Sequence, residues 1–416
     1  MAGPNLPLLA WRNLWRNRRR TVITLVSITM GLFLALFFTS IQDRQFGDMI
    51  DVNARNIGGH VMVEHPDYQD APSLEHSVKG VADLKARIAR DPEVLAVTDR
   101  IVGQVMLQTA HDSAGTGFIA YDPAQETLET FGVLDAITSG EPFASADDKG
   151  IILGQKLAEN LNVELGDKVV LTLMDSDGEL IVEAARLKAI ARTGSPAFDA
   201  SLCLLPLQTT RDLLSYGPDE ATLIGVFLKD GRKTDAVASR LGELPGAVAL
   251  TWDQVAPELA GFIAMKVGGG IFMEIVIALL VVASIFNTLF MSVLERLREF
   301  GIQLAIGYTP AQLFLMVVFE SLWLALSGII AGLAVFAVPY LLMNQYGLDM
   351  GGLFGIDPAE QMDVAGVGFS MVIYAGIYPD HLALILVIVF LATLLAGLYP
   401  AWRAGRVEPV EVIKLV

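Results

Sequence analysis

The sequence predicts an α-helical membrane protein with four transmembrane helices and a large extracytoplasmic domain between the first and second spans. Of the 416 residues, 53% are hydrophobic and only 18% are charged, which is too apolar for an ordinary soluble protein. Four apolar runs, at residues 22–38, 271–294, 313–342 and 382–398, are long enough to cross all or most of a bilayer. The long segment after the first run mixes strand-like and helix-like patterns, which predicts a two-lobed α/β domain.

Charge is distributed unevenly along the chain. The formal net charge is -17, and residues 43–265 contain 35 Asp and Glu against 18 Lys and Arg, an excess of 17 acids, so the acidity belongs to the central segment. We therefore expect no binding of nucleic acid through a basic surface. The only cysteine, Cys203, excludes an internal disulfide.

Residues 1–20 are predicted to form a cytoplasmic helix that lies among the lipid headgroups. Between residues 6 and 20, leucines and two tryptophans alternate with five arginines, which is typical of an interfacial helix and less typical of a solvated basic tail. Residues 21–41 form the first span, which we expect to be retained because no small-residue cleavage site follows it. The arginines then place the N-terminus inside.

Residues 42–265 are predicted to form the extracytoplasmic domain. Alternating or β-rich runs predict strands at 60–64, 102–108, 118–121, 168–173, 180–189 and 222–228. Helical patterns occur at 81–89, 155–161 and 233–241. The segment Asp175-Ser176-Asp177-Gly178 between two predicted strands is a good hairpin turn.

The segment 295–307, ERLREFGIQLAIG, is charged and lies between the second and third spans. Such a segment must lie at a membrane surface, and Arg296 and Arg298 favour the cytoplasmic surface. A cytosolic partner could there push on the membrane part of the protein. The alternative is that these charges only anchor an interfacial helix.

The second and third spans contain polar groups. Glu274 lies near the outer end of the second span, where the headgroup region can solvate it, which favours an interfacial role over a functional one. Asn287, with Ser284 and Thr288, can hydrogen-bond to another helix. The third span is predicted to begin at a capping box formed by Thr309 and Gln312, with Pro310 at the first helical position. It also contains Glu320 and a small-residue motif, Gly328 and Gly332, which permits close helix contact.

The last part of the chain completes the topology. Residues 344–381 contain five acids, Asp349, Asp357, Glu360, Asp363 and Asp380, and no Lys or Arg, as expected of an outside loop. After the fourth span, Arg403, Arg406 and Lys414 return the chain to the cytoplasm. The sequence thus predicts four spans with both ends inside.

Motifs for catalysis are absent from the sequence. Gly166-Asp167-Lys168 lacks the spacing and the hydroxyl residue of a phosphate-binding loop, and there is no zinc-binding helix motif or nucleophile elbow. The five histidines stand apart, and His60 with His65 is more typical of surface residues than of a ligand pair. We expect no catalytic residue, no cofactor and no metal, and any energy must come from another subunit.

The order of one span, a large outer domain and three further spans resembles the ABC transporter permeases of the FtsX, MacB and LolC/LolE type. The segment after the second span is similar to their signature Glu-Arg-x-x-Glu-(apolar)-Gly-x-x-x-Ala-x-Gly. It is matched by Glu295, Arg296, Glu299, Gly301, Ala305 and Gly307. Supporting matches are Glu320, the 150–154 to Gly166-Asp167 segment, and residues 400–404 with Pro409.

The resemblance implies a non-enzymatic subunit in the bacterial inner membrane, with residues 266–416 as the FtsX-like permease domain and its large domain in the periplasm. Two permease chains, the same or sister chains, would pair with a dimer of cytosolic ATPase subunits, whose closure is received at the coupling helix 295–307. Because the resemblance includes no fused ATPase domain, we expect a separate ATPase. The lipoprotein-releasing branch is the nearest.

Three functions follow as hypotheses. The first is extraction or export of a lipoprotein or other amphipathic substrate, with Phe46, Met49 and Ile50 as candidate contacts, although these three are also spaced for helix packing. The second is mechanotransmission without transport, which drives a periplasmic adaptor, an exit duct or an envelope enzyme. The third is a membrane receptor or scaffold that needs no ATP.

Overall fold

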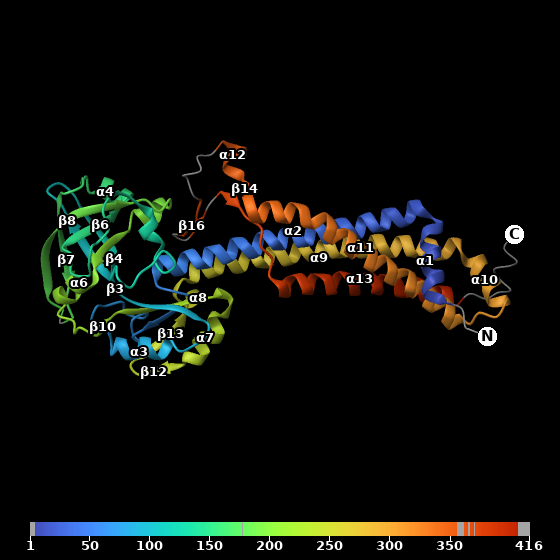
Figure 1. The fold of residues 1–416 in the computed structure, drawn as a ribbon, viewed down its shortest axis with the longest axis horizontal. Coiled ribbons are helices and arrows are strands. Elements are labelled where there is room, and N and C mark those ends of the chain that lie inside the picture. The colour runs from blue at the N-terminus through green and yellow to red at the C-terminus, as the bar shows by residue number, and fades with distance from the viewer. Residues whose placement is uncertain (1–4, 177, 356–361, 365–366, 370, 407–416) are drawn as a thin grey trace. The chain divides into compact units, whose positions relative to one another are not determined.

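The computed structural model describes residues 5–176, 178–355, 362–364, 367–369 and 371–406. The chain divides into two compact units, which we call the helical unit and the α/β unit (Figure 1). The helical unit comprises Met1–Gln45, Ala264–Leu348 and Ile373–Val416, and the α/β unit comprises Phe46–Ile263 and Asp349–Val372. Five residues that entered the sequence predictions lie outside the described residues: Asp177, Asp357, Glu360, Pro409 and Lys414.

Among the described residues, four helices are long and apolar enough to cross a membrane, which confirms the four predicted spans. They are α2 (Arg18–Ile57), α9 (Pro257–Glu295), α11 (Pro310–Tyr346) and α13 (Pro379–Gly405). The predicted cap of α11 is present, because the Thr309 hydroxyl accepts from the Gln312 amide at 3.3 Å while the Gln312 side chain accepts from the Thr309 amide at 2.8 Å. Two short helices, α1 (Leu6–Arg16) and α10 (Leu297–Ala305), complete this unit.

Small residues bring α11 close to α2 within the same chain. A Cβ atom added at Gly328 would lie 2.5 Å from Ile28, and one added at Gly332 would lie 2.7 Å from Leu32. Ile28 and Leu32 are fully buried. Any larger residue at either glycine would force the two helices apart, so this motif is used for packing inside one chain.

Within the helical unit, hydrogen bonds join the middle of α2 to the start of α13 and the residues that precede it. Asp43 of α2 is 9% exposed, and its carboxylate accepts a bond from the Tyr378 amide at 3.1 Å and contacts His381 Nδ1 at 2.8 Å. The Gly376 amide donates to the Ser40 carbonyl at 2.9 Å. These bonds fix the start of α13 against α2.

The α/β unit is built on a sheet with one long strand, β3 (Val94–Gln108), that has strands on both sides. We call these two sets of strands the lobes: β1, β11, β12 and β13 form the first lobe, and β4 to β9 form the second. Its first part pairs antiparallel with β11 (Leu223–Leu228), and its second part pairs with β4 (Ser113–Tyr121) and β7 (Lys168–Met174). The remaining strands of this sheet are β1 (Val61–Glu64), β5 (Ile137–Gly140), β6 (Gly150–Gly154), β8 (Leu180–Ala191), β9 (Cys203–Pro206), β12 (Glu243–Leu244) and β13 (Ala247–Thr251). The predicted mixed α/β domain is confirmed.

Helices cover the two lobes (Figure 1). They are α3 (Val81–Ile88), α4 (Gln155–Asn160), α5 (Pro196–Asp199), α6 (Leu207–Leu213), α7 (Thr234–Leu241) and α8 (Trp252–Val255), with 3-10 turns at Gly132–Ala136 and Gly231–Lys233. Short peripheral elements are β2 (Val78–Lys79), β10 (Glu220–Ala221), β14 (Leu348–Asp349), α12 (Met350–Phe354), β15 (Met362–Val364), β16 (Val367–Phe369) and β17 (Val372–Ile373).

The predicted hairpin joins β7 to β8. The Gly178 amide donates to the Asp175 carbonyl at 3.2 Å, and Gly178 has a φ of +82°, a conformation that glycine adopts without steric cost. Sequence patterns placed six strands and three helices in the α/β unit, and each of them overlaps an observed element. The patterns gave β3 only its second half, and they did not predict β5, β6, β9, β12 or β13.

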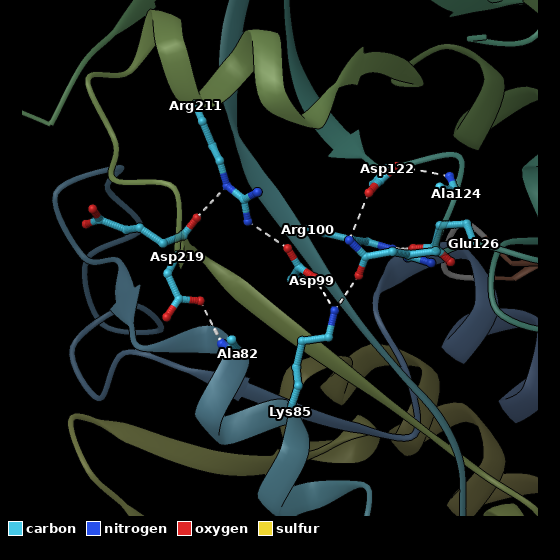
Figure 2. Close-up of polar contacts among 11 residues, drawn as sticks. Ala82, Lys85, Asp99, Arg100, Asp122, Ala124, Glu126, Arg211 and Asp219 are labelled. Atoms are coloured by element: carbon cyan, nitrogen blue, oxygen red, sulfur yellow. Dashed lines mark hydrogen bonds and ion pairs between the residues drawn. The ribbon is translucent and has the colours of Figure 1, made fainter. Parts of the chain in front are cut away.

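Two neighbouring residues of β3 carry buried ion pairs on opposite faces of the strand (Figure 2). Asp99 is bound by Arg211 at 2.7 Å and by Lys85 of α3. Arg100 is fully buried and donates to Glu126 at 2.7 Å. Such pairs attach α3, α6 and the segment around Glu126 to the strand that the two lobes share.

Cys203 of β9 provides a way to measure folding of the α/β unit. It is 1% exposed, and burial raises the pKa of its thiol, so it is doubly protected from thiol reagents. We expect no labelling by a maleimide in mild detergent and full labelling after unfolding, measured by gel shift. A Ser113→Cys variant should be labelled once without unfolding, because Ser113 is exposed. Complete native labelling of the unmodified chain would contradict the burial.

Candidate functional site

The segment 295–307 forms the end of α9, a break at Arg296 and then α10. Phe300 of α10 is fully buried and packs with Leu313 and Val317 of α11 and with Ala10 of α1. The helix is therefore held between α1 and α11 by its apolar face. This packing requires the apolar residues of α10 to recur at helical spacing, as they do in the sequence.

The amphipathic N-terminal helix α1 lies against α11. The Trp323 indole N–H donates to the Pro7 carbonyl at 3.0 Å, and the rings of Trp11 and Trp323 meet edge to face with centroids 5.2 Å apart. Trp15 is 40% exposed. Trp11 thus anchors α1 to α11, whereas Trp15 is accessible to the surroundings of the protein.

Ion pairs link α1, α2, α9, α10 and α11 at this end of the helical unit. Arg16 makes two hydrogen bonds to the carboxylate of Glu299, one of them at 2.8 Å, and Arg20 binds Glu295. Arg296 donates to Glu320 at 2.8 Å and lies 3.5 Å from Glu299. Asn13 donates to Glu320 at 3.1 Å. We call these seven residues the coupling cluster: Asn13, Arg16, Arg20, Glu295, Arg296, Glu299 and Glu320.

Glu320 is the most buried acid of the coupling cluster, with a side chain 3% exposed. A charged group in such a place is costly unless it is paired, and Arg296 with Asn13 supplies that pairing. Beside it is a small cavity of about 30 Å³ lined mainly by polar side chains. The polar lining residues are Asn13, Asn17, Arg20, Thr21, Thr24, Thr288, Ser292 and Glu320.

The hydrogen bond from Arg16 lowers the pKa of Glu299 below its ordinary value, against the opposing effect of partial burial. Glu299 is therefore ionised at neutral pH. A carboxylate with a lowered folded-state pKa contributes stability that is complete above its ordinary pKa and is lost as the pH falls through the lowered value. The contact between α1 and α10 is expected to weaken only in acid.

The residues of the predicted coupling helix fall into two sets. Arg296, Glu299 and Gly301 face the other helices, with Gly301 buried. The others, Glu295, Arg298, Ala305 and Gly307, are exposed. The charges of Arg296 and Glu299 thus make contacts inside the chain.

Two exposed apolar residues of the same segment were missed in the sequence. Ile302 is 49% exposed and Ile306 is 71% exposed. With Arg298 and Ala305 they form an exposed strip along α10, which we call the outer strip of α10. The i, i+4 spacing of residues 298, 302 and 306 was the signal that could have revealed it.

The remaining predicted contact residues are placed as follows. Glu320, Gly328 and Gly332 are buried among the helices. Asn287 is exposed on α9, whereas Ser284 on the same helix contacts Ser27 at 3.0 Å. Glu274 accepts a hydrogen bond from Thr39 at 2.5 Å, so its carboxylate has a partner inside the chain.

Phe46, Met49 and Ile50 pack in the α/β unit against the first turns of α9. Met49 is 2% exposed and lies with Leu259 and Ile263, and Phe46 and Ile50 are partly buried against this group. The structure therefore gives them a packing role, and contact with a substrate stays a prediction.

Known families match most of the chain. The MacB-like periplasmic core domain matches residues 21–244, and the FtsX-like permease C-terminal family matches residues 271–409. The first match alone covers more than half of the chain.

Individual relatives align with most of the chain. The chain is 20% identical to the lipoprotein-releasing system transmembrane protein LolE of Haemophilus influenzae over 85% of each chain, and 22% identical to LolC of Neisseria meningitidis serogroup B over 95% of this chain and 94% of that one. It is 22% identical to the pyoverdine export ATP-binding/permease protein PvdT of Pseudomonas entomophila over 97% of this chain and 58% of that protein.

The two matched families, the four spans and the α/β unit after the first span agree with one another. Members of this group are permeases that work with a cytosolic ATPase and often with a partner permease. The chain belongs to the ABC transporter permeases of the FtsX, MacB and LolC/LolE type, as a multi-pass protein of the inner membrane.

Proposed function

We propose that this permease couples ATP hydrolysis by a separate cytosolic ATPase dimer to movement of its α/β unit, and thereby extracts or exports a lipoprotein or another amphipathic substrate. The observation that carries the proposal is the arrangement of α10. Its inner side is fixed to α1 and α11 by the coupling cluster, and its outer strip is free of cover within the described chain.

A helix held in this way can pass on a displacement. A push on the outer strip of α10 reaches α11 through the pair of Arg296 and Glu320, and it reaches α1 through the pair of Glu299 and Arg16. Because packed helices shift as bodies and do not deform continuously, the displacement moves the helices together. Because α2 and α9 each continue from the helical unit into the α/β unit, they can carry the displacement to the α/β unit.

The proposed orientation places both chain termini and α10 in the cytoplasm and the α/β unit in the periplasm. Arg16, Arg18, Arg19 and Arg20 lie at one end of the first span, and Arg403 and Arg406 lie at the end of α13, in agreement with the positive-inside rule. The exposed apolar residues of α9, such as Phe272, Leu279 and Leu280, are available to membrane lipid or to a second permease chain.

Lipoproteins are the favoured substrate class because two relatives, aligned over 85% and 94% of their length, are transmembrane proteins of lipoprotein-releasing systems. Such substrates present acyl chains in the membrane and a polar body outside it. A membrane unit joined to a large outer unit has a surface for each part.

The Ile302→Glu/Ile306→Glu variant tests the proposal. Burying one isoleucine in a partner contributes about 1.5–3 kcal/mol, so we expect the variant to lose its ATPase partner by roughly tenfold or more in affinity. The measurement is co-purification in mild detergent, with mass spectrometry and an ATPase assay. Leu165→Glu, at a leucine that is 46% exposed in the α/β unit, is the matched control and should retain the partner.

Each outcome distinguishes a function. Undiminished ATPase binding by the double variant would refute the docking role of the outer strip of α10. Recovery of the unmodified chain with no ATPase would favour a receptor or scaffold. A co-purified adaptor in place of a lipoprotein would favour mechanotransmission.

A further inference from the structure

Two histidines and an aspartate meet in the segment that follows β1 in the α/β unit. They are His65, Asp67 and His76, and one possible metal-ligating atom of each lies within 4.8 Å of those of the other two. The two imidazole rings are nearly parallel, with an interplanar angle of 6° and centroids 5.1 Å apart. This group was not predicted from the sequence, because eight residues lie between Asp67 and His76.

Hydrogen bonds determine which ring nitrogens are unprotonated and can therefore bind a metal ion. His76 Nδ1 lies 3.0 Å from the Ala71 carbonyl, which can only accept, so Nδ1 carries the proton and Nε2 has the lone pair. A backbone carbonyl bound to one nitrogen of a histidine is the arrangement that commonly orients a metal ligand.

His65 offers Nδ1 as its ligand atom, whereas His76 offers Nε2. Its Nδ1 accepts a long bond of 3.2 Å from the Asp67 amide, so this atom is unprotonated. The same Nδ1 lies 3.7 Å from Asp67 Oδ2. A cation between these two atoms would replace the long amide bond.

The segment that carries the three residues is fastened to the rest of the unit. The Tyr68 hydroxyl donates to the Val102 carbonyl at 2.9 Å, and the Tyr216 hydroxyl donates to the Leu74 carbonyl. Gln69 donates to Glu64 at 2.7 Å. Because these anchors lie between and beside the candidate ligands, little chain entropy remains to be lost when an ion binds.

We propose that His65 Nδ1, Asp67 Oδ2 and His76 Nε2 bind a divalent transition-metal ion such as Zn²⁺. Two imidazoles and one carboxylate suit zinc and copper, whereas magnesium and calcium select oxygen ligands. Zinc bonds of about 2.0–2.2 Å place tetrahedral ligands roughly 3.4 Å apart, so binding requires the ligand atoms to approach one another and the two stacked rings to turn until their in-plane lone pairs meet at the ion. Asp67 is 70% exposed, which leaves the fourth position open to water.

The surroundings favour a cation. The segment 43–265 carries 35 acids against 18 bases, so its field attracts positive ions. Since the ion would join residue 65 to residue 76, it would close the loop between them and stabilise this part of the α/β unit. This site is independent of the coupling cluster and of the proposed transport function.

The test is zinc binding by the full chain in mild detergent, purified without a histidine tag and stripped with a chelator. After incubation with Zn²⁺ and removal of free metal, we expect about one bound ion per chain by mass spectrometry of the metal. The variants His76→Ala and Asp67→Asn should bind roughly none. His111→Ala and Asp70→Asn should bind as the unmodified chain does, since both residues are exposed and outside the group.

Folding is checked by protection of Cys203 in each variant. Asp67→Asn keeps the test valid if His76→Ala fails to fold, because the backbone hydrogen bond that the Ala71 amide donates to the Asp67 carbonyl is retained. Zinc should also raise the unfolding temperature of the unmodified chain and not that of Asp67→Asn. The proposal is overturned if the unmodified chain retains no zinc, or if Asp67→Asn and His76→Ala retain as much as the control variants.

Discussion

The Glu299→Lys variant is expected to abolish stimulation of the ATPase while membrane insertion and folding of the α/β unit persist. The substitution places a positive charge beside Arg16 and Arg296, which both contact the native carboxylate. At a separation of about 4 Å, one such contact contributes roughly 1 kcal/mol in water and about 4 kcal/mol near a protein surface, so reversing its sign changes the interaction by about twice as much. Each 1.4 kcal/mol or so is tenfold in an equilibrium, so we expect at least roughly a tenfold loss of stimulation.

The effect should fall on the position of α10 and not on overall stability. The pair of Arg16 and Glu299 is exposed, at 65% and 34% of the side chains, and exposed pairs contribute only about 0–1 kcal/mol to folding. Cys203 should therefore stay protected in the variant.

A charge swap separates position from charge. Arg16→Glu/Glu299→Lys restores an attraction between α1 and α10, and it should recover part of the stimulation, with Arg296 still repelled. Glu129→Lys, at an exposed acid of the α/β unit, controls for net charge. Full ATPase stimulation by Glu299→Lys would show that this contact does not transmit the signal.

The Arg100→Ala variant is expected to lower the free energy of unfolding of the α/β unit by about 3–5 kcal/mol, the usual result of removing one member of a buried pair. Arg100 donates to Glu126 at 2.7 Å, to the Thr130 carbonyl at 2.8 Å and to the Ile57 carbonyl at 3.2 Å. Its guanidinium also lies 4.4 Å from the ring centroid of Phe131. Alanine would leave the Glu126 carboxylate, 1% exposed, without its countercharge.

The measurement is labelling of Cys203 as a function of denaturant in mild detergent. Arg90→Ala, at an exposed arginine, should change the midpoint little. The double variant Arg100→Met/Glu126→Leu should recover most of the loss, because an apolar pair of similar volume avoids the cost of desolvating two charges. An unchanged midpoint in Arg100→Ala would mean that the pair does not stabilise this unit.

The two variants test different steps of the proposed mechanism. Glu299→Lys changes how a force enters the helical unit, and Arg100→Ala changes the rigidity of the unit that responds. If the α/β unit must move as a body, a softened β3 should reduce transport while ATP hydrolysis continues. Loss of stimulation and loss of rigidity are therefore expected to have separable effects.

Local patterns were sufficient for the elements whose cause is local. Runs of apolar residues predicted the four spans, Thr309 and Gln312 predicted the start of α11, and the Asp175 to Gly178 segment predicted the β7–β8 hairpin. Each of these depends on residues within one or two turns of one another, so the sequence order alone contains the information. The same is true of the acidic character of the central segment.

Contacts between distant residues were decided only by the tertiary structure. Glu299 was a candidate for contact with an ATPase, yet it binds Arg16, 283 positions away, and this leaves Ile302 and Ile306 on the exposed side. β3 extends through both lobes because two different sets of strands pair along it, which the alternation within one strand does not reveal. Periodicity determines which residues share a face, whereas the partner of that face depends on how all the elements pack together.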